Sequence, residues 1–342
     1  MRKTAAKIIL ISIFIVFLFP AISLAEKVLV IDPGHGGDFK GTCGYSGNLT
    51  GFCEKDANLA VGLKLRDILK DSDITVYMTR ETDKQFAPYL RLPNGESQGG
   101  DFEVRTDIAN DYAKGNNDNS ILISIHHNQH VNTPQTRGIE TYYYDGINNF
   151  KPEFPHDPIQ KKFLSDNRRL AEAAHENLLN TLGLNDRELR FDQSFFVLRN
   201  AQMPAILVEL GYMTNPEEEK LIASEAFQQD AAQTLADTVI NYFKVYEVFD
   251  NTNEKIKVFS EQSEAIDFAE TLEKGAYVFS KDKQKVIFPN SPLNDTLFKL
   301  QSDVCNDSPM IMLYQSLLPR LFQWKQIGYV CHITQQRKYG YF

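Results

Sequence analysis

Short apolar runs alternate with amphipathic stretches between residues 27 and 243. Residues 27–31, 121–125 and 205–210 are almost wholly apolar, which is typical of strands buried on both faces. Two further strands are predicted at residues 74–78 and 138–144, and helices at residues 54–70, 103–114, 166–182, 216–223 and 225–243. Strands that alternate with helices predict an α/β fold, in which helices flank a mainly parallel, twisted sheet.

Side chains that could bind a metal or transfer a proton lie at the ends of three of these apolar runs. His35 lies in a glycine-rich segment directly after the first run, and His126 directly follows residues 121–125. Glu209 lies inside the last run, where a carboxylate is costly to bury without a cation or strong donors; the alternative is a salt bridge to Arg80 or Arg105. Because ligands bind beyond the carboxyl ends of the strands in open α/β sheets, these positions are expected to converge.

A metal site is the chemistry that this set of residues favours. His35, His126 and Glu54, which opens a predicted helix, supply two imidazoles and one carboxylate. Three such ligands leave one coordination position of zinc open, as in catalytic sites, and Glu209 can then serve as a proton acceptor. Taken singly, His35 reads as a loop residue and Glu54 as a favourable acidic residue in a first helical turn. His127 is the second-choice ligand, since it points away from His126 along an extended backbone.

The character of the chain changes after about residue 250. Residues 250–254 form a polar stretch that we interpret as a linker, and a small strand–helix–strand unit is predicted at 256–259, 264–273 and 276–279, with a further strand at 285–288. The expected organisation is a catalytic domain at 26–246 and a small α+β appendage of unknown role at 255–342. Residues 86–101 and 146–158 are expected to be surface loops that either wall a substrate groove or merely connect elements.

The N-terminus has the pattern of a signal peptide. Arg2 and Lys3 precede an apolar run at residues 8–19, and Ser23 and Ala25 are small residues at the positions that a signal peptidase reads. Cleavage after Ala25 predicts an exported protein, periplasmic or extracellular and associated with the cell wall. The run is shorter than the ~20 residues of a spanning helix, although a retained signal anchor is the alternative. No stable membrane span is expected after cleavage.

Composition and cysteine content refine these expectations. The 342 residues carry a formal net charge of -9, which argues against nucleic acid as a partner. The four cysteines fit an oxidising compartment; proximity pairs Cys43 with Cys53 and Cys305 with Cys331, while other connectivities and four reduced thiols remain open. A bridge between the first two would close a short loop between two candidate metal ligands and would stabilise by roughly 2–3 kcal/mol.

Eight sequence blocks resemble the zinc-dependent N-acetylmuramoyl-L-alanine amidases of the bacterial cell wall, the family of the periplasmic cell-separation amidases. In that family's order they are VLVIDPGHGG (28–37), EKD (54–56), MTR (78–80), RTDIAN (105–110), SIHHN (124–128), GIETY (138–142), FVLR (196–199) and MPAILVELGYMTN (203–215). The resemblance spans residues 27–243. His127, where the family commonly has a small residue, and the loop between Cys43 and Cys53 depart from the pattern, and the C-terminal region lies outside it.

The resemblance implies that His35, Glu54 and His126 bind one zinc ion and that Glu209 is the catalytic carboxylate. The implied substrate is peptidoglycan, cleaved at the amide bond between N-acetylmuramic acid and L-alanine. Asn128 and Arg105 are candidates for holding substrate, against a structural hydrogen-bonding role for both. Amidases of this family are often held inactive by an inserted helix, so the resemblance leaves room for an activator or septal partner protein, although the sequence does not show that one is needed. Residues 146–158 are too short and proline-rich to be such a helix, and residues 159–182 are the candidate for occluding the groove.

Two other functions compete with this interpretation. The chemistry of the residues by itself suits a zinc peptidase or deacetylase that acts on another cell-wall amide. A wall-binding or regulatory protein built on an inactive amidase domain is the less favoured alternative, since all four residues of the expected site are present.

Overall fold

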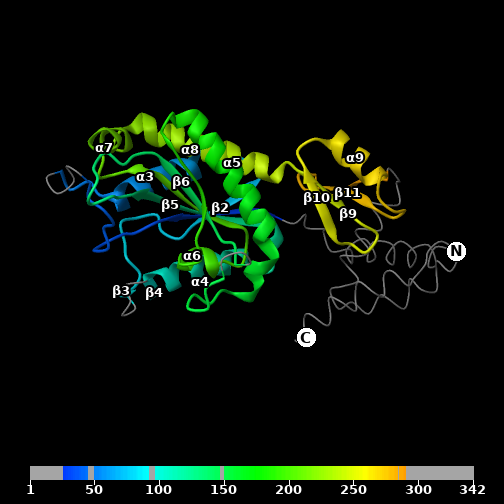
Figure 1. The fold of residues 1–342 in the computed structure, drawn as a ribbon, viewed down its shortest axis with the longest axis horizontal. Helices are drawn as coiled ribbons and strands as arrows, with labels where there is room; N and C mark the ends of the chain where they lie inside the picture. The colour runs from blue at the N-terminus through cyan, green and yellow to red at the C-terminus, as the bar shows by residue number, and fades with distance from the viewer. Residues whose placement is uncertain (1–25, 45–49, 92–96, 147–149, 284, 290–342) are drawn as a thin grey trace, which may run out of the picture. The chain divides into compact units, whose positions relative to one another are not determined.

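The computed structural model describes residues 26–44, 50–91, 97–146, 150–283 and 285–289, and it divides into two compact units at Phe243 and Lys244 (Figure 1). The larger unit is an α/β domain and the smaller one contains an antiparallel sheet with a helix. No helix within these ranges combines the length and apolar character needed to cross a bilayer. The predicted signal peptide, residues 1–25, lies outside the described residues.

The larger unit is built on a six-stranded sheet with the order β2-β1-β5-β8-β6-β7. The strands are β1 (Lys27–Pro33), β2 (Ile74–Met78), β5 (Ser120–Asn128), β6 (Ile139–Tyr143), β7 (Asp186–Phe191) and β8 (Ala205–Tyr212). β2, β1, β5 and β8 are parallel, whereas β6 runs antiparallel to β8 and β7 is parallel to β6. This arrangement confirms the prediction of an α/β fold with a mainly parallel sheet.

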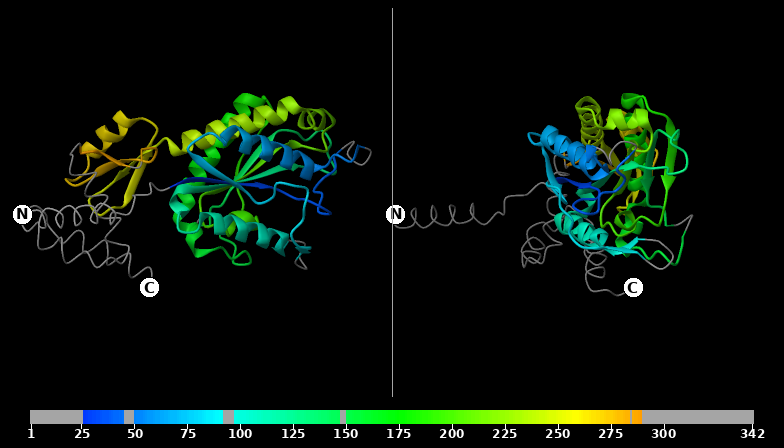
Figure 2. Two further views of the ribbon diagram at one scale, coloured as in Figure 1. Left: turned by 180° about the vertical axis from the view of Figure 1, so that it is seen from behind. Right: turned by 90° about the vertical axis from the view of Figure 1, so that its left-hand side faces the viewer.

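Helices cover both faces of this sheet (Figures 1 and 2). α3 (Glu54–Leu69), α5 (Leu164–Leu182) and α8 (Glu225–Phe243) share an apolar core with one face, to which β1 contributes Leu29 and Ile31. α4 (Asp101–Ala113) and the short α6 (Phe196–Arg199) cover the other face, to which β1 contributes Val28 and Val30. Because successive side chains of a strand point to opposite faces, burial on both sides explains the unbroken apolar runs of β1, β5 and β8.

Several elements differ from the prediction. A hairpin of β3 (Tyr89–Arg91) and β4 (Ser97–Gly100) lies within the expected loop at 86–101. η1 (Asn117–Asn119) and η2 (Pro158–Phe163) are short 3-10 helices before β5 and α5. β7 was not predicted, because it is an edge strand with mostly charged residues and no apolar run. α7 (Pro216–Ile222) matches its prediction and is capped by the Asn215 side chain, which accepts the N–H groups of the second and third residues of the helix.

The smaller unit has the strand order β10-β9-β11-β12, with all described neighbours antiparallel. Its elements are β9 (Tyr246–Phe249), β10 (Lys255–Phe259), α9 (Gln262–Glu270), β11 (Tyr277–Ser280) and β12 (Lys285–Phe288). The predicted α+β appendage is thus confirmed, but the predicted linker is wrong: residues 250–254 turn between β9 and β10. The Asp250 carboxylate accepts the N–H groups of Thr252 and Glu254 and closes that turn. Cys305 and Cys331 lie outside the described residues.

Candidate active site

The carboxyl ends of β1, β5 and β8 lie side by side and bring the predicted site residues to one edge of the sheet. His35 follows β1 directly, whereas His126 and Glu209 are still inside β5 and β8 and are register partners across these two strands. Paired residues of neighbouring parallel strands point to the same side of a sheet. The alternation of buried residues assigns this side to the face that α4 and α6 cover.

A single carboxylate oxygen connects three of the predicted residues. Oε1 of Glu54, from the first turn of α3, lies 3.1 Å from Nε2 of His35 and 2.9 Å from Nδ1 of His126. One ligand atom from each residue falls within 4.8 Å of the others. Donors about 2.0–2.1 Å from a tetrahedral zinc ion are about 3.3 Å apart, so this cluster has the donor types and spacing that suit such an ion. The structure therefore provides a candidate site for one divalent cation.

The protonation states of the cluster also suit a cation. Burial alone would raise the pKa of Glu54, but the adjacent imidazoles of His35 and His126 hold it well below its usual value. Burial lowers the pKa of His126, despite the opposing effect of Glu54. Metal ligands must be deprotonated, and these shifts favour the ionised carboxylate and a neutral imidazole.

The loop that carries His35 is held by two buried arginines. Arg80 donates to the carbonyls of Pro33 and Gly34 at 2.8 and 3.0 Å. Arg105 donates to the carbonyl of Pro33 at 2.9 Å and to that of His35. His35 itself has a φ of 62°, a left-handed conformation that a non-glycine residue rarely adopts without support from its surroundings. The arginines supply that support to the backbone that carries the imidazole.

Gly34 is required by the neighbouring strand. A Cβ atom at this position would overlap the imidazole ring of His126. Any other residue would therefore displace one of the two clustered histidines, which explains the glycine immediately before His35.

Arg105 has the structural hydrogen-bonding role that the sequence analysis set against contact with substrate. Its guanidinium is buried and also donates to Asp101 at 2.5 Å and to Asp32 at 3.0 Å. Asp32 accepts two further hydrogen bonds, from Thr79 and Ser124. Arg105 thus neutralises buried carboxylates beneath the site and directs four of its five N–H groups to protein acceptors.

Glu209 differs sharply from the clustered residues. It is buried, and its Oε2 atom has no hydrogen-bond partner among the described residues. Burial, together with repulsion from Glu54 and Glu140, raises its pKa well above the usual value. The alternative of a salt bridge is not supported, since Arg80 and Arg105 direct their donors to the loop and to other carboxylates.

Glu140 on β6 is a neighbour that the sequence analysis did not assign. It is the register partner of Glu209 on the side away from His126. Hydrogen bonds reach its carboxylate from Tyr142, Tyr212, Arg187 and Asn128, at 2.7–2.9 Å. Burial would raise its pKa, but the hydrogen bonds from Tyr142, Tyr212 and Arg187, with the charge of Arg190, lower it, so an ionised Glu140 stands beside Glu209. A charged residue inside the predicted strand at 138–144 was the signal available in the sequence.

Asn128 and His127 have protein partners of their own. The Asn128 amide donates to Glu140, and its Oδ1 accepts the N–H of Gln129 at 2.7 Å. His127 faces α3, with Nδ1 2.7 Å from Oδ1 of Asn58, and burial lowers its pKa to about 3. His127 is not part of the three-residue cluster, and its role as the second-choice ligand finds no support.

The buried residues of α5, Leu170, Ala171, Ala174 and Leu178, belong to the core on the opposite face of the sheet from His126 and Glu209. α3, which supplies Glu54, packs on the same face as α5. The expectation that residues 159–182 cover the groove stays a prediction.

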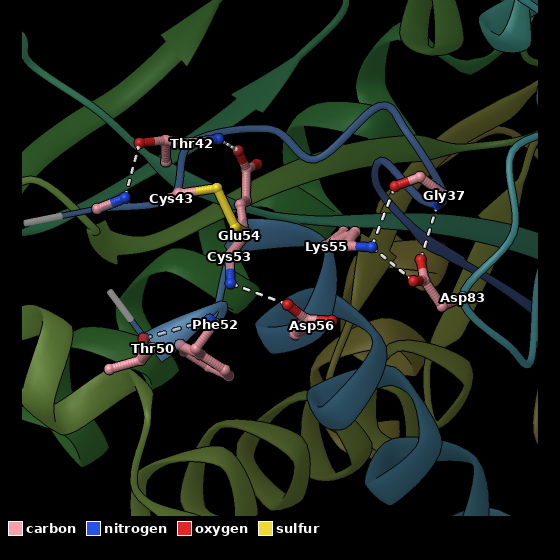
Figure 3. The surroundings of a disulfide bond; sticks show 11 residues. Gly37, Thr42, Cys43, Thr50, Phe52, Cys53, Glu54, Lys55, Asp56 and Asp83 are labelled. Carbon is pink, nitrogen blue, oxygen red and sulfur yellow. Dashed lines mark hydrogen bonds and ion pairs between the residues drawn. A yellow bond between two sulfur atoms is a disulfide. The ribbon is translucent and has the colours of Figure 1, made fainter. Parts of the chain in front are cut away.

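The first predicted cysteine pair is confirmed as a disulfide between Cys43 and Cys53 (Figure 3). It joins the loop after His35 to the residue that precedes Glu54.

Comparison with known proteins is consistent with this geometry. A family model described as N-acetylmuramoyl-L-alanine amidase matches residues 29–241. The chain is 26% identical over 223 residues to the germination-specific N-acetylmuramoyl-L-alanine amidase of Bacillus subtilis, covering 65% of this chain and 82% of that protein. It is 27% identical over 229 residues to N-acetylmuramoyl-L-alanine amidase AmiA of Escherichia coli, covering 64% and 76%. Among solved structures, the catalytic domain of CwlV from Bacillus (Paenibacillus) polymyxa is 30% identical with a TM-score of 0.47, covering 63% of this chain and 97% of that one.

Proposed function

Because the chain belongs to the family of N-acetylmuramoyl-L-alanine amidases, we propose that it hydrolyses its substrate with one zinc ion held by His35, Glu54 and His126. The protein is a hydrolase of peptidoglycan and cleaves the amide bond between N-acetylmuramic acid and L-alanine. The observation that carries the metal proposal is the position of Glu54 Oε1 between two imidazoles. A second carboxylate, Glu209, has a buried oxygen that no residue in the described ranges hydrogen-bonds.

Glu209 is the general base of the proposed mechanism. A zinc ion in this site would polarise the amide carbonyl and acidify water. The Glu209 carboxylate removes a proton from the attacking water molecule and then delivers it to the departing alanine nitrogen. Its position supports this role, because it is the register partner of the ligand His126 and points to the same side of the sheet.

The remaining residues of the site position these groups. Arg80 and Arg105 hold the His35 loop, and Asp32 anchors Arg105. Glu140 orients Asn128, whose partly exposed side chain remains our candidate for contact with the substrate next to Glu209. The raised pKa of Glu209 favours its protonated form until a cation or substrate dipole compensates its charge.

We further propose that residues 26–246 act as the catalytic region and that the protein is exported to the periplasm or cell surface. The support is its substrate, which lies outside the cytoplasm, together with the signal-peptide pattern at residues 1–25. Peptidoglycan is its partner as substrate; an activator or septal partner remains part of the proposal and is supported by the family resemblance alone. Residues 255–342 are left without an assigned role.

Digestion of purified peptidoglycan tests the proposed function. The zinc-loaded protein should release stem peptides that begin at L-alanine, identified by mass, and a chelator should stop the release until zinc is added back. Products from cleavage between two amino acids would instead identify a peptidase, and loss of acetyl groups a deacetylase. Glu209→Gln serves as the matched control, since the variant retains the proposed ligands and lacks the base.

A further inference from the structure

The disulfide between Cys43 and Cys53 lies next to the proposed metal ligand Glu54 (Figure 3). Cys53 is the N-cap residue of α3, and Glu54 is the first residue of that helix. Cys43 is preceded by Thr42, a buried residue in the loop that follows His35. The bridge therefore ties the segment around Thr42 to the start of the helix that supplies the ligand.

The two oxygens of Glu54 face different surroundings. Oε1 points to His35 and His126, whereas Oε2 accepts the backbone N–H of Thr42 at 3.0 Å (Figure 3). A carboxylate with one oxygen bound in this way presents only the other oxygen to a cation. Hydrogen bonds of this kind, from groups that do not themselves touch the metal, orient ligating carboxylates and tune metal affinity.

Backbone hydrogen bonds join the segment at residues 40–42 to the first turn of α3. The N–H of Glu54 donates to the carbonyl of Thr42 at 2.8 Å, and the N–H of Lys55 donates to the carbonyl of Lys40 at 3.2 Å. Gly41 lies between these two contacts, with a φ of +68°, and a Cβ atom there would overlap Oε2 of Glu54. The backbone thus passes directly over the carboxylate, at a distance that only glycine permits.

The bridge is the covalent restraint on this arrangement. Two backbone–backbone hydrogen bonds, each worth about 0.5–1.5 kcal/mol, hold the segment to the helix start, and the bond from the Thr42 N–H to the ionised Glu54 carboxylate adds about 1.5–3 kcal/mol. On the other side of Cys53, its N–H donates to the Asp56 carboxylate at 2.8 Å, which fixes the N-cap. Because Cys53 is anchored to the helix in this way, the disulfide transmits that anchoring to Thr42.

We propose that Thr42 is a positioning residue whose N–H fixes Glu54 as a ligand through one oxygen, and that the Cys43–Cys53 bridge holds this donor in place. The inference rests on the proposed function of Glu54 as a zinc ligand. It assigns a purpose in metal binding to a disulfide that also stabilises the fold. Zinc affinity should therefore depend on the bridge, beyond any effect of the bridge on the free energy of unfolding.

Zinc binding by the full-length protein measures this dependence. The double variant Cys43→Ala/Cys53→Ala should bind zinc about 10–100-fold more weakly than the wild type in competition with a chromophoric chelator. The matched control Cys305→Ala/Cys331→Ala removes the same number of sulfur atoms and should bind like the wild type. Zinc affinity within twofold of the wild type in a folded Cys43→Ala/Cys53→Ala protein would overturn the proposal, whatever its melting temperature.

A second variant keeps the test valid if the double variant does not fold. Gly41→Ala retains both cysteines and the Thr42 N–H but places a methyl group against Oε2 of Glu54. It should weaken zinc binding and alter the visible spectrum of the cobalt-substituted protein, whereas unchanged affinity and spectrum would count against the proposal. If the wild type itself binds no zinc, the proposed function fails; if it binds zinc and the variants match it, only the positioning role fails.

Discussion

Two buried glutamates at one edge of the sheet have opposite electrostatic settings. Glu54, from α3, lies between two imidazoles and accepts a backbone N–H, and its pKa is held well below the usual value. Glu209, from β8, has a buried oxygen with no hydrogen-bond partner in the described part of the chain and two carboxylate neighbours, and its pKa is raised well above the usual value. Burial is common to both, so the difference arises from the partners that the fold provides.

This difference suits the two glutamates to different roles in the proposed mechanism. A residue that is ionised before the cation arrives suits a ligand, because no proton has to be displaced. A residue that holds a proton tightly until positive charge is nearby suits an acid–base catalyst. The same edge of the sheet thus holds one carboxylate suited to the proposed metal site and another suited to the proposed proton transfer.

Removal of a ligand should have the largest effect on activity. His126→Ala leaves Glu54 with one imidazole partner, and we expect a loss of at least about 4 kcal/mol in transition-state stabilisation, roughly a thousandfold in kcat/KM. Release of stem peptides and zinc content should fall together. His130→Ala, which removes an exposed imidazole outside the cluster, is the control and should retain wild-type activity. Full activity of His126→Ala would contradict the assignment of the ligand.

Removal of the base should reduce activity without loss of metal. We expect Glu209→Gln to lower kcat by about 10²–10⁴-fold, the usual contribution of a general acid–base group. Zinc binding should remain close to that of the wild type, because Glu209 is not one of the three clustered ligands. A variant that lost zinc and activity in parallel would show that both glutamates act as ligands, and the division of roles would be wrong.

Substitution of Arg105 should lower the free energy of unfolding, and any loss of activity should follow from that loss of stability. Arg105→Met leaves Asp32 and Asp101 buried without their cation, and we expect the free energy of unfolding to fall by about 3–5 kcal/mol. The control Arg66→Met removes ion pairs to Asp67 and Glu81 that are largely exposed, and it should cost at most about 1 kcal/mol. Urea denaturation measures both. An Arg105→Met protein as stable as the wild type, with a raised KM, would restore a substrate-binding role.

The catalytic edge could be predicted from sequence because apolar runs and strand ends encode it locally. The runs that form β1, β5 and β8 end near His35, His126 and Glu209, and the carboxyl ends of these parallel strands meet at one edge of the sheet. The Cys43–Cys53 pair followed from proximity along the chain.

What could not be predicted depends on contacts between distant segments. The burial of Arg105 is stabilised by Asp32, 73 residues away, and no local pattern reveals that pairing. Glu140 meets Glu209 only because β6 turns back against β8, a reversal that the apolar pattern does not encode. β7 has few apolar residues because it is an edge strand, and the turn at 250–254 is as polar as a linker.

The smallest expected effect is on the stability of the metal-free protein. Because the pKa of Glu209 lies above its usual 4.5, the folded protein binds this proton more tightly than the unfolded chain does. The resulting stabilisation is present below pH 4.5 and is lost as the pH rises through the raised pKa. Glu209→Gln removes this loss. The melting temperature of the variant at pH 8 should therefore exceed that of the wild type by about 2–4 °C, which corresponds to about 1 kcal/mol in the free energy of unfolding.

Calorimetry should show that this difference in melting temperature becomes smaller in acid and after zinc is added. The control Glu140→Gln, at a carboxyl whose pKa is lowered, should instead destabilise the protein. A Glu209→Gln protein that melts below the wild type at pH 8 would mean that a donor already satisfies this carboxylate, and the contrast with Glu54 would disappear.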